Sequence, residues 1–300
     1  MDPLLIPAAN PGKRRIPDRP SLTAAVVSLL ARHNLWLEPE LAGLTDLVRP
    51  GDVCVDVGAA AGLYTLTLSQ LVGPAGQVHS VEPLSSAHPA WSRLLGAGDR
   101  PNVRRHRLAL SAQPGQTTLS VPTGRLGPVT GRSFLAWQTD GLGSNTEFSS
   151  HTDVLVPVDT LDHLCAGLTR LDFVKIDVEG AELHVLHGGA HAIETFEPSL
   201  LLEIEARHLT RYRHAVQDVT GWLTSRGYTM HIWQRGWRPT AVVCPHSRNY
   251  LFRPPARTSS PDRAAAPDRV AAPDRVAGPD RVAGPDRIAG PATSTPQHGE

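Results

Sequence analysis

The sequence has few of the residues that mark secreted, membrane-spanning or zinc-binding proteins. Three cysteines occur among 300 residues, and they form no CxxC or CxxH pair. Because their number is odd and they are widely spaced, we expect free thiols in a reducing cytoplasm. No apolar run has the length of a signal peptide, or the about 18 residues of a membrane span. We therefore expect a cytoplasmic protein that does not bind a membrane.

The sequence also lacks an excess of charge of either sign. Lys+Arg and Asp+Glu each number 29, so the net charge is zero when histidine is neutral. A domain that binds nucleic acid usually carries a basic excess. We therefore predict no nucleic-acid partner.

Composition divides the chain into three parts. Residues 1–20 hold five prolines and are predicted to form a flexible arm. Residues 255–300 repeat Pro-Asp-Arg with a period of six, and this proline spacing excludes a long helix or a central strand. Each repeat offers too little apolar surface to offset the entropy of ordering. We predict a disordered tail, or alternatively a docking segment, after one folded domain at residues 21–254.

Short apolar runs alternate with helical patterns across this domain. The β-α-β order indicates an α/β fold with a mostly parallel sheet and helices on both faces. Residues 117–121 and 154–158 are predicted as edge strands, with a glycine-rich loop at 122–153 between them. The expected strands are Val53–Val57, Gln77–Val81, Val103–Leu108, Phe173–Ile176, Leu200–Ile204, Tyr228–Trp233 and Tyr250–Phe252. The expected helices are one from Ser21, then Glu38–Leu47, Gly62–Val72, Ser86–Leu95, Leu161–Cys165, Ala181–Leu186 and Val216–Ser225.

A glycine motif follows the first of these strands. Asp56 lies near the strand end, and Gly58-x-x-x-Gly62 leads into a helix. The glycines allow a tight turn and close approach to a ligand. A nicotinamide dinucleotide site usually has a further glycine where this chain has Ala60, which leaves less room for a pyrophosphate. The acid instead suits a ligand with an ammonium group, and S-adenosylmethionine carries both an ammonium and a sulfonium.

The second strand ends in an acid, Glu82. An acid at the tip of this strand can accept both hydroxyls of a ribose. The two motifs in this order therefore favour an adenosyl ligand over an α/β core without a ligand.

A third motif resembles a known family. Residues 172–189 read DFVKIDVEGAELHVLHGG, after VDVGAAAGLYT and VDTLDHL and before PSLLLE and NYLFRP. This set resembles the FkbM family of S-adenosylmethionine-dependent methyltransferases over about residues 45–254. One departure is Ala60, where the family commonly has asparagine.

The resemblance implies a class I methyltransferase fold and, as the usual activity, O-methylation. The fold would have a Rossmann-like, mostly parallel seven-stranded sheet whose last strand pair is antiparallel. By position, Asp56, Gly58, Ala60 and Gly62 would surround the methionine end of the cofactor. Glu82 would hold the ribose, and the backbone at Ala109 and Leu110 would lie near the adenine.

Carboxylates after the fourth parallel strand are candidates for the chemistry. A hydroxyl acceptor gains from a base that takes its proton. Asp177 and Glu179 are the predicted catalytic residues, because crowded acids raise one another's pKa values. Alternatively, Glu182 only stabilises a helix N-terminus and Lys175 only pairs with an acid.

We predict no metal site. The alternatives are a histidine site and a divalent ion held by carboxylates. Gly188-Gly189 is expected to end the helix that carries His184 and His187 before His191, which disfavours the first. The second would use Asp177, Glu179 and Glu203, since oxygen ligands suit magnesium.

The sequence thus predicts a methyltransferase that uses S-adenosylmethionine and acts on a hydroxyl of a small molecule, such as a sugar or secondary metabolite. The loop at 122–153, with Phe134, Trp137 and Phe148, is expected to form the acceptor pocket or a plain surface insertion. The alternatives are a nicotinamide-dependent oxidoreductase and a non-catalytic scaffold with a docking tail. The sequence leaves the acceptor, the methylated atom and the oligomeric state open.

Overall fold

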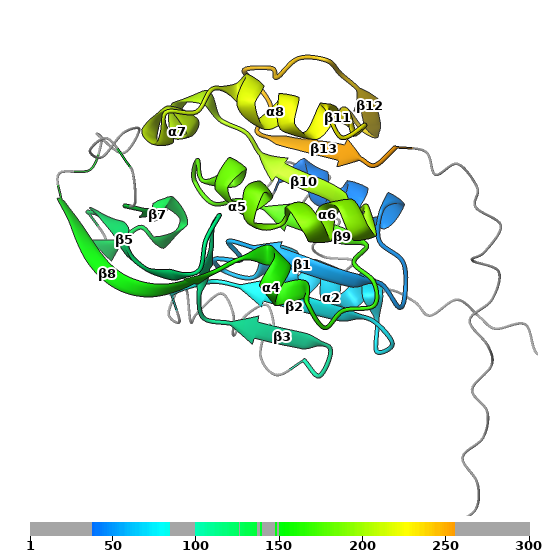
Figure 1. Cartoon of the computed structure of the whole chain (residues 1–300), viewed down its shortest axis with the longest axis horizontal. Helices are drawn as coiled ribbons and strands as arrows, with labels where there is room; N and C mark the ends of the chain where they lie inside the picture. The colour runs from blue at the N-terminus through cyan, green and yellow to red at the C-terminus, as the bar shows by residue number, and fades with distance from the viewer. Residues whose placement is uncertain are drawn as a thin grey trace, which may run out of the picture. The chain divides into compact units, whose positions relative to one another are not determined.

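The computed structural model describes residues 38–84, 100–125, 127–136, 139, 148 and 150–255 (Figure 1). The predicted arm at 1–20, the helix from Ser21, the helix at Ser86–Leu95 and almost all of the predicted tail lie outside these residues. Their boundaries therefore stay predictions.

The main sheet has the order β12-β11-β13-β10-β9-β1-β2-β3. The five strands from β3 to β10 pair in parallel, whereas β13, β11 and β12 pair antiparallel. The sheet is therefore mostly parallel, as predicted from the β-α-β order. Its strands are β1 (Val53–Val57), β2 (Gln77–Val81), β3 (Val103–His106), β9 (Phe173–Ile176), β10 (Ser199–Glu203), β11 (Thr229–Trp233), β12 (Trp237–Pro239) and β13 (Asn249–Arg253).

The described part of this sheet has eight strands, so the prediction of seven was wrong by one. The added strand, β12, forms a hairpin with β11 in which Trp233 pairs with Trp237. Arg235 and Gly236 make the turn with positive φ values of 56° and 154°. The indole Nε1 of Trp237 donates to the Gly43 carbonyl at 3.1 Å, which anchors the short strand.

A second, smaller sheet has the order β4-β8-β5-β6, with β7 paired to β5. The predicted edge strands at 117–121 and 154–158 belong here, paired antiparallel with each other, and not at an edge of the main sheet. Their apolar side chains bury one another, with Leu119, Val121 and Val156 in a separate core. The strands are β4 (Ala109–Leu110), β5 (Gly115–Gly124), β6 (Gly127–Pro128), β7 (Phe134–Leu135) and β8 (Ser150–Asp159).

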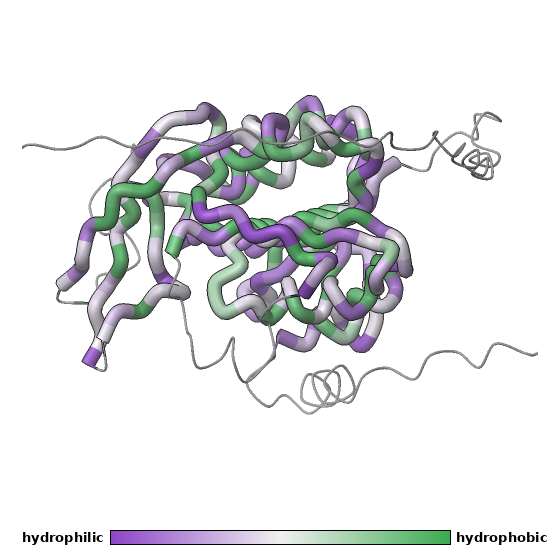
Figure 2. Tube along the Cα trace, turned by 90° about the horizontal axis from the view of Figure 1, so that it is seen from below, coloured by the Kyte–Doolittle hydropathy of each residue, from purple (hydrophilic) through white to green (hydrophobic). Residues whose placement is uncertain are grey.

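Helices cover both faces of the main sheet. Successive strand residues point to opposite faces, so Val55 packs with α4, α5, α6 and α8, whereas Cys54 packs with η1 and α2. Figure 2 shows hydrophobic stretches running through both sheets. The helices are η1 (Pro39–Asp46), α2 (Leu63–Val72), η2 (Thr130–Arg132), α4 (Leu161–Cys165), α5 (Glu182–Gly188), α6 (Ala190–Phe196), α7 (Ala206–Leu209), η4 (Thr210–Tyr212) and α8 (Val216–Thr224).

The cysteines agree with the expectation of free thiols. Cys54 and Cys165 are buried, Cys244 is partly exposed, and none forms a disulfide. Among the described helices, none has the length and apolar character needed to cross a bilayer.

Candidate functional site

A pocket opens where the carboxyl ends of β1, β2 and β9 meet, and we call it the crevice. In open α/β sheets ligands bind at this edge of the strands. The second sheet supplies the opposite wall. The lining residues are Val57, Gly58, Ala60, Val81, Glu82, Pro83, Leu108, Ala109, Leu110, Leu119, Thr130, Gly131, Ser133, Phe134, Leu135, Asp177, Val178 and Glu179.

The glycine turn after β1 forms the floor of the crevice. Gly58 has φ +78°, and a Cβ there would overlap the carbonyl oxygen of Asp177, so only glycine fits. Gly62, with φ 83°, caps the N-terminus of α2 but is not among the lining residues. Ala60 adopts φ 43°, in the left-handed region that favours glycine or asparagine.

Glu82 is fixed at the tip of β2 by backbone donors. Its Oε2 accepts the Ala60 N–H and its Oε1 accepts the Leu84 N–H, both at 2.9 Å. Each carboxylate oxygen keeps a further lone pair for a ligand hydroxyl. Burial raises the pKa of Glu82 above its usual range.

Asp56 lies behind the floor and does not line the crevice. Its side chain is 1% exposed and accepts the Thr65 hydroxyl at 2.6 Å. Burial raises the pKa of Asp56 to about 6. Of the predicted cofactor-binding residues, the crevice thus gathers Gly58, Ala60, Glu82, Ala109 and Leu110, but neither Asp56 nor Gly62.

Asp177 follows β9 and pairs with the fully buried Lys175. The Lys175 Nζ lies 3.3 Å from Asp177 Oδ2 and 3.0 Å from Asn249 Oδ1. The ion pair holds the Asp177 carboxyl group at the edge of the crevice. Lys175 pairs with an acid, as one of the sequence alternatives held.

Glu179 is held in a strained conformation in the turn after Asp177. It has φ 55°, and the next residue, Gly180, has φ 109°. The Arg211 guanidinium donates to the Glu179 carbonyl oxygen at 2.8 Å, which helps to fix the turn. Backbone strain of this kind concentrates at functional sites. Burial, and then the nearby Asp177, raise the pKa of Glu179 to about 8.

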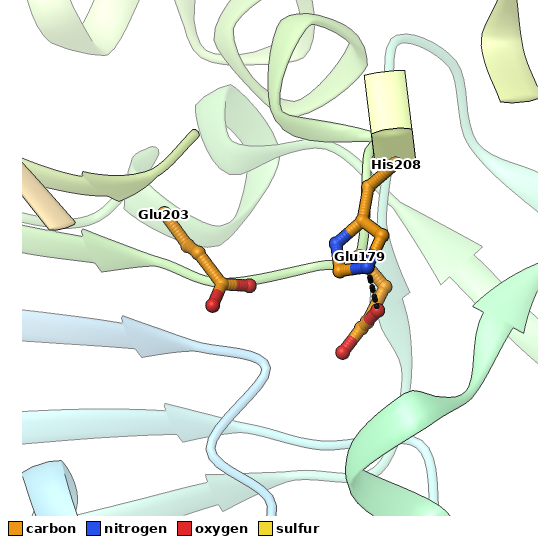
Figure 3. A group of neighbouring side chains, drawn as sticks. All are labelled: Glu179, Glu203 and His208. Atoms are coloured by element: carbon orange, nitrogen blue, oxygen red, sulfur yellow. Dashed lines mark ion pairs between the residues drawn. The ribbon is translucent and has the colours of Figure 1, made fainter. Parts of the chain in front are cut away.

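Two further side chains approach Glu179 from the end of β10 and from α7 (Figure 3). His208 Nε2 lies 3.2 Å from Glu179 Oε2. Burial lowers the pKa of His208 to about 4. Burial, and then Asp177, raise the pKa of Glu203 to about 10. At neutral pH the Glu179–His208 contact is therefore between uncharged groups and is not an ion pair.

The remaining sequence candidates have structural roles. Glu182 Oε1 accepts the N–H groups of Gly180 at 3.1 Å and Val178 at 3.3 Å, which secures the start of α5. This agrees with the helix-terminus alternative. His184 packs edge-on against other rings, and α5 ends at Gly188, before His191.

Part of the predicted loop at 122–153 closes the crevice. Phe134 and Leu135 of β7 are among the lining residues. The Arg211 guanidinium lies 3.8 Å from the Phe134 ring centroid, and the Tyr212 hydroxyl donates to the Leu135 carbonyl oxygen at 2.8 Å. Helix η4 thereby holds β7 over the crevice. Trp137 lies outside the described residues.

The lining of the crevice is acidic. It includes Glu82, Asp177 and Glu179, and among the lining residues of the described chain there is no lysine or arginine. Sequence reasoning missed Arg132, His208 and Arg211, which approach the site from short helices with no recognisable motif.

A family model described as the methyltransferase FkbM domain matches residues 56–230. No curated protein sequence matches the chain.

Several solved structures are similar. The methyltransferase FkbM from Methylobacillus flagellatus is 18% identical, with a TM-score of 0.41 over 76% of this chain and 54% of that one. An S-adenosylmethionine-dependent O-methyltransferase from Thermotoga maritima is 12% identical, with a TM-score of 0.40 over 74% and 67%. Fibrillarin from Aeropyrum pernix, with bound S-adenosylmethionine, is 14% identical, with a TM-score of 0.38 over 72% and 73%. The chain spans about half the length of the first of these proteins.

Proposed function

The chain belongs to the FkbM family of methyltransferases, and we propose that it transfers a methyl group from S-adenosylmethionine to a hydroxyl group of a small molecule. A sugar or a secondary metabolite is the proposed acceptor class. The fold is that of the class I S-adenosylmethionine-dependent methyltransferases. The proposal applies to the domain at residues 21–254, and a cytoplasmic location stays a prediction.

The acidic lining of the crevice carries this proposal. The cofactor has a sulfonium and an ammonium group. A lining with the acidic side chains of Glu82 and Asp177, and no lysine or arginine among its described residues, suits such a cation. The negatively charged pyrophosphate of a nicotinamide dinucleotide would meet repulsion there. The charge of the crevice therefore favours the methyltransferase over the oxidoreductase alternative.

We assign the cofactor's parts to residues by the chemistry of each wall. Glu82 would accept the ribose hydroxyls, and the apolar side chain of Leu110 would pack near the adenine. Gly58 and Ala60 would approach the methionine end through their backbone. Asp56 and Gly62 would act from behind the floor, since neither lines the crevice.

Asp177 is the proposed general base. When bound, S-adenosylmethionine supplies a methyl group that is already activated, so the protein must mainly orient the acceptor and take its proton. Lys175 Nζ lies 3.3 Å from Asp177 Oδ2 and keeps the side chain in place. Glu179 lines the crevice beside Asp177 and would help to position the acceptor.

Calorimetric titration with S-adenosylmethionine and a tritiated-methyl assay against cell extracts test the proposal separately. We expect Glu82→Gln to weaken cofactor binding. We expect Asp177→Asn to retain binding but to lower turnover by about 10²–10⁴-fold, the usual contribution of a general base. Glu205→Gln, outside the crevice lining, is the matched control and should change neither. If the wild-type chain gives no heat with S-adenosylmethionine, the proposal is wrong.

A further inference from the structure

Three side chains that could hold a metal ion converge beside the crevice: Glu179, Glu203 and His208. Each offers one ligand atom, and these atoms lie within 4.8 Å of one another. Figure 3 shows His208 and Glu179 in contact, with the Glu203 carboxylate approaching from β10. Their exposed fractions are 8%, 9% and 2% for Glu179, Glu203 and His208. The group is therefore built into the protein interior, where ionisable side chains seldom lie without partners.

Two of these ligand atoms form no hydrogen bond with any residue that the structure describes. They are Glu179 Oε2 and His208 Nε2, which lie 3.2 Å apart. Leaving a buried polar atom unsatisfied costs about 1–3 kcal/mol, so native structures usually supply a partner. Two neighbouring ligands of an octahedral ion, each about 2.1 Å from it, lie about 3 Å apart. The observed separation therefore suits an ion between them.

Both acidic and cationic side chains surround this group, and Arg132 and Arg211 both act on Glu179. The Glu203 and Glu179 carboxyls lie close to Asp177, whose own carboxylate contacts the ammonium of Lys175 at 3.3 Å. Arg132 Nε is 3.7 Å from Glu179 Oε2, which is beyond hydrogen-bond distance. Crowded carboxylates repel one another when ionised, and a divalent ion removes that repulsion.

We propose that Glu179, Glu203 and His208 bind a divalent transition-metal ion of the Mn²⁺ type. Two carboxylates and an imidazole suit Mn²⁺ better than Ca²⁺ or Mg²⁺, which prefer oxygen ligands alone. Glu179 lines the crevice, so the ion would face the acceptor. The role of the ion rests on the proposed function. The ion would hold the acceptor hydroxyl and lower the pKa of that hydroxyl, so that Asp177 removes the hydroxyl proton more readily.

Electron paramagnetic resonance of the full chain titrated with Mn²⁺ tests the proposal directly. We expect saturable binding of one ion per chain, and a nitrogen coupling in the spin-echo spectrum from the imidazole of His208. The coupling needs no variant, so the result does not depend on whether a variant folds. Absence of saturable Mn²⁺ binding, or binding without nitrogen coupling, would overturn the proposal.

Matched variants identify the ligands. Glu203→Gln and His208→Gln should weaken Mn²⁺ binding at least about tenfold. Residues that only support the ligands of a metal site already change its affinity by about 10–100-fold, so the loss of a ligand should cost no less. Glu194→Gln and His214→Gln change the same residue types outside this group and should leave the affinity unchanged. Equal loss in all four variants would contradict a specific site. Thermal unfolding of each variant shows that the comparison is between folded proteins.

Two binding measurements under different conditions distinguish failure of the metal site from failure of the proposed methyltransferase function. Mn²⁺ binding is measured without S-adenosylmethionine, and cofactor binding is measured in a chelator. Cofactor binding without Mn²⁺ binding would contradict the metal site alone. Mn²⁺ binding without cofactor binding would contradict the methyltransferase proposal alone.

Discussion

At the scale of single residues, Ala60 combines backbone strain with a role in the crevice. Its φ of 43° lies in the left-handed region, which disfavours most residues other than glycine and asparagine. The same backbone N–H donates a hydrogen bond to the Glu82 carboxylate. Removing the Cβ should relieve about 1–2 kcal/mol of strain and lose about 0.5–1 kcal/mol to chain entropy.

We therefore expect Ala60→Gly to raise the free energy of unfolding by about 0.75 kcal/mol, the difference between the midpoints of these two effects. Denaturant unfolding measures it. Ala59→Gly is the control, because the buried Ala59 does not have a positive φ and should lose stability. A loss in both variants would show that Ala60 is not strained.

Asp56 gives the folded protein a pH dependence. Its pKa is about 6 in the fold and about 4 in an unfolded chain, because burial penalises the charged form. A folded-state pKa above the unfolded value gives stability that is complete below about pH 4 and is lost as the pH rises through 6. Asp56→Asn removes this dependence and keeps an oxygen that can accept the Thr65 hydroxyl.

The stability of Asp56→Asn relative to the wild type should therefore increase between about pH 4 and about pH 7, two values that span the titration range. Unfolding curves at the two pH values measure this difference. A constant difference between the proteins would mean that Asp56 titrates normally in the fold.

At the scale of elements, the contact between η4 and β7 shapes the crevice. The Tyr212 hydroxyl donates to the Leu135 carbonyl oxygen, and Leu135 lines the crevice. Tyr212→Phe leaves that buried acceptor unpaired, at a cost of about 1–3 kcal/mol. We expect lower stability together with weaker binding of S-adenosylmethionine, measured by thermal unfolding and calorimetry.

Tyr228→Phe is the matched control for this contact. Its hydroxyl donates to the Pro198 carbonyl oxygen, which is also buried but does not line the crevice. It should lose similar stability without a change in cofactor affinity. If both variants bind the cofactor equally well, β7 does not shape the cofactor site.

Local sequence patterns predicted the main sheet better than the second sheet. Gln77–Val81 and Phe173–Ile176 are strands with the predicted bounds, because each is a short buried run between turn residues. The β5–β8 pairing could not be predicted, since it joins residues as far apart as Gly115 and Val158. Such pairing depends on tertiary contacts that leave no periodic signal.

The candidate site likewise contains residues that local sequence patterns predict and residues that only tertiary packing brings there. Glu82, Asp177 and Glu179 were predictable because the carboxyl ends of parallel strands share one edge. His208 was not predictable, because its place in the site depends on how α7 packs against the turn at Gly180. The two segments are so close that a Cβ on Gly180 would overlap the His208 carbonyl oxygen. That contact is set by the packing of the whole domain and not by the residues around His208.

At the scale of the whole molecule, β13 is the last described strand and lies inside the main sheet. Asn249–Arg253 pairs with β10 on one side and β11 on the other. We expect a chain that ends at Pro255 to keep its melting temperature and its affinity for S-adenosylmethionine. Thermal unfolding and calorimetry compare it with the full chain. A marked loss of either would show that residues 256–300 contribute to the domain.

The central position of β13 also determines when the protein can fold during its synthesis. The ribosome makes β10 and β11 first, but in the sheet each of them pairs with a strand that emerges after both. Until then their backbone edges remain open to other nascent chains, which is the situation in which aggregation begins. Completion of this sheet therefore waits for β13, and a cell short of chaperones should lose this protein before it loses proteins whose sheets close in the order of synthesis.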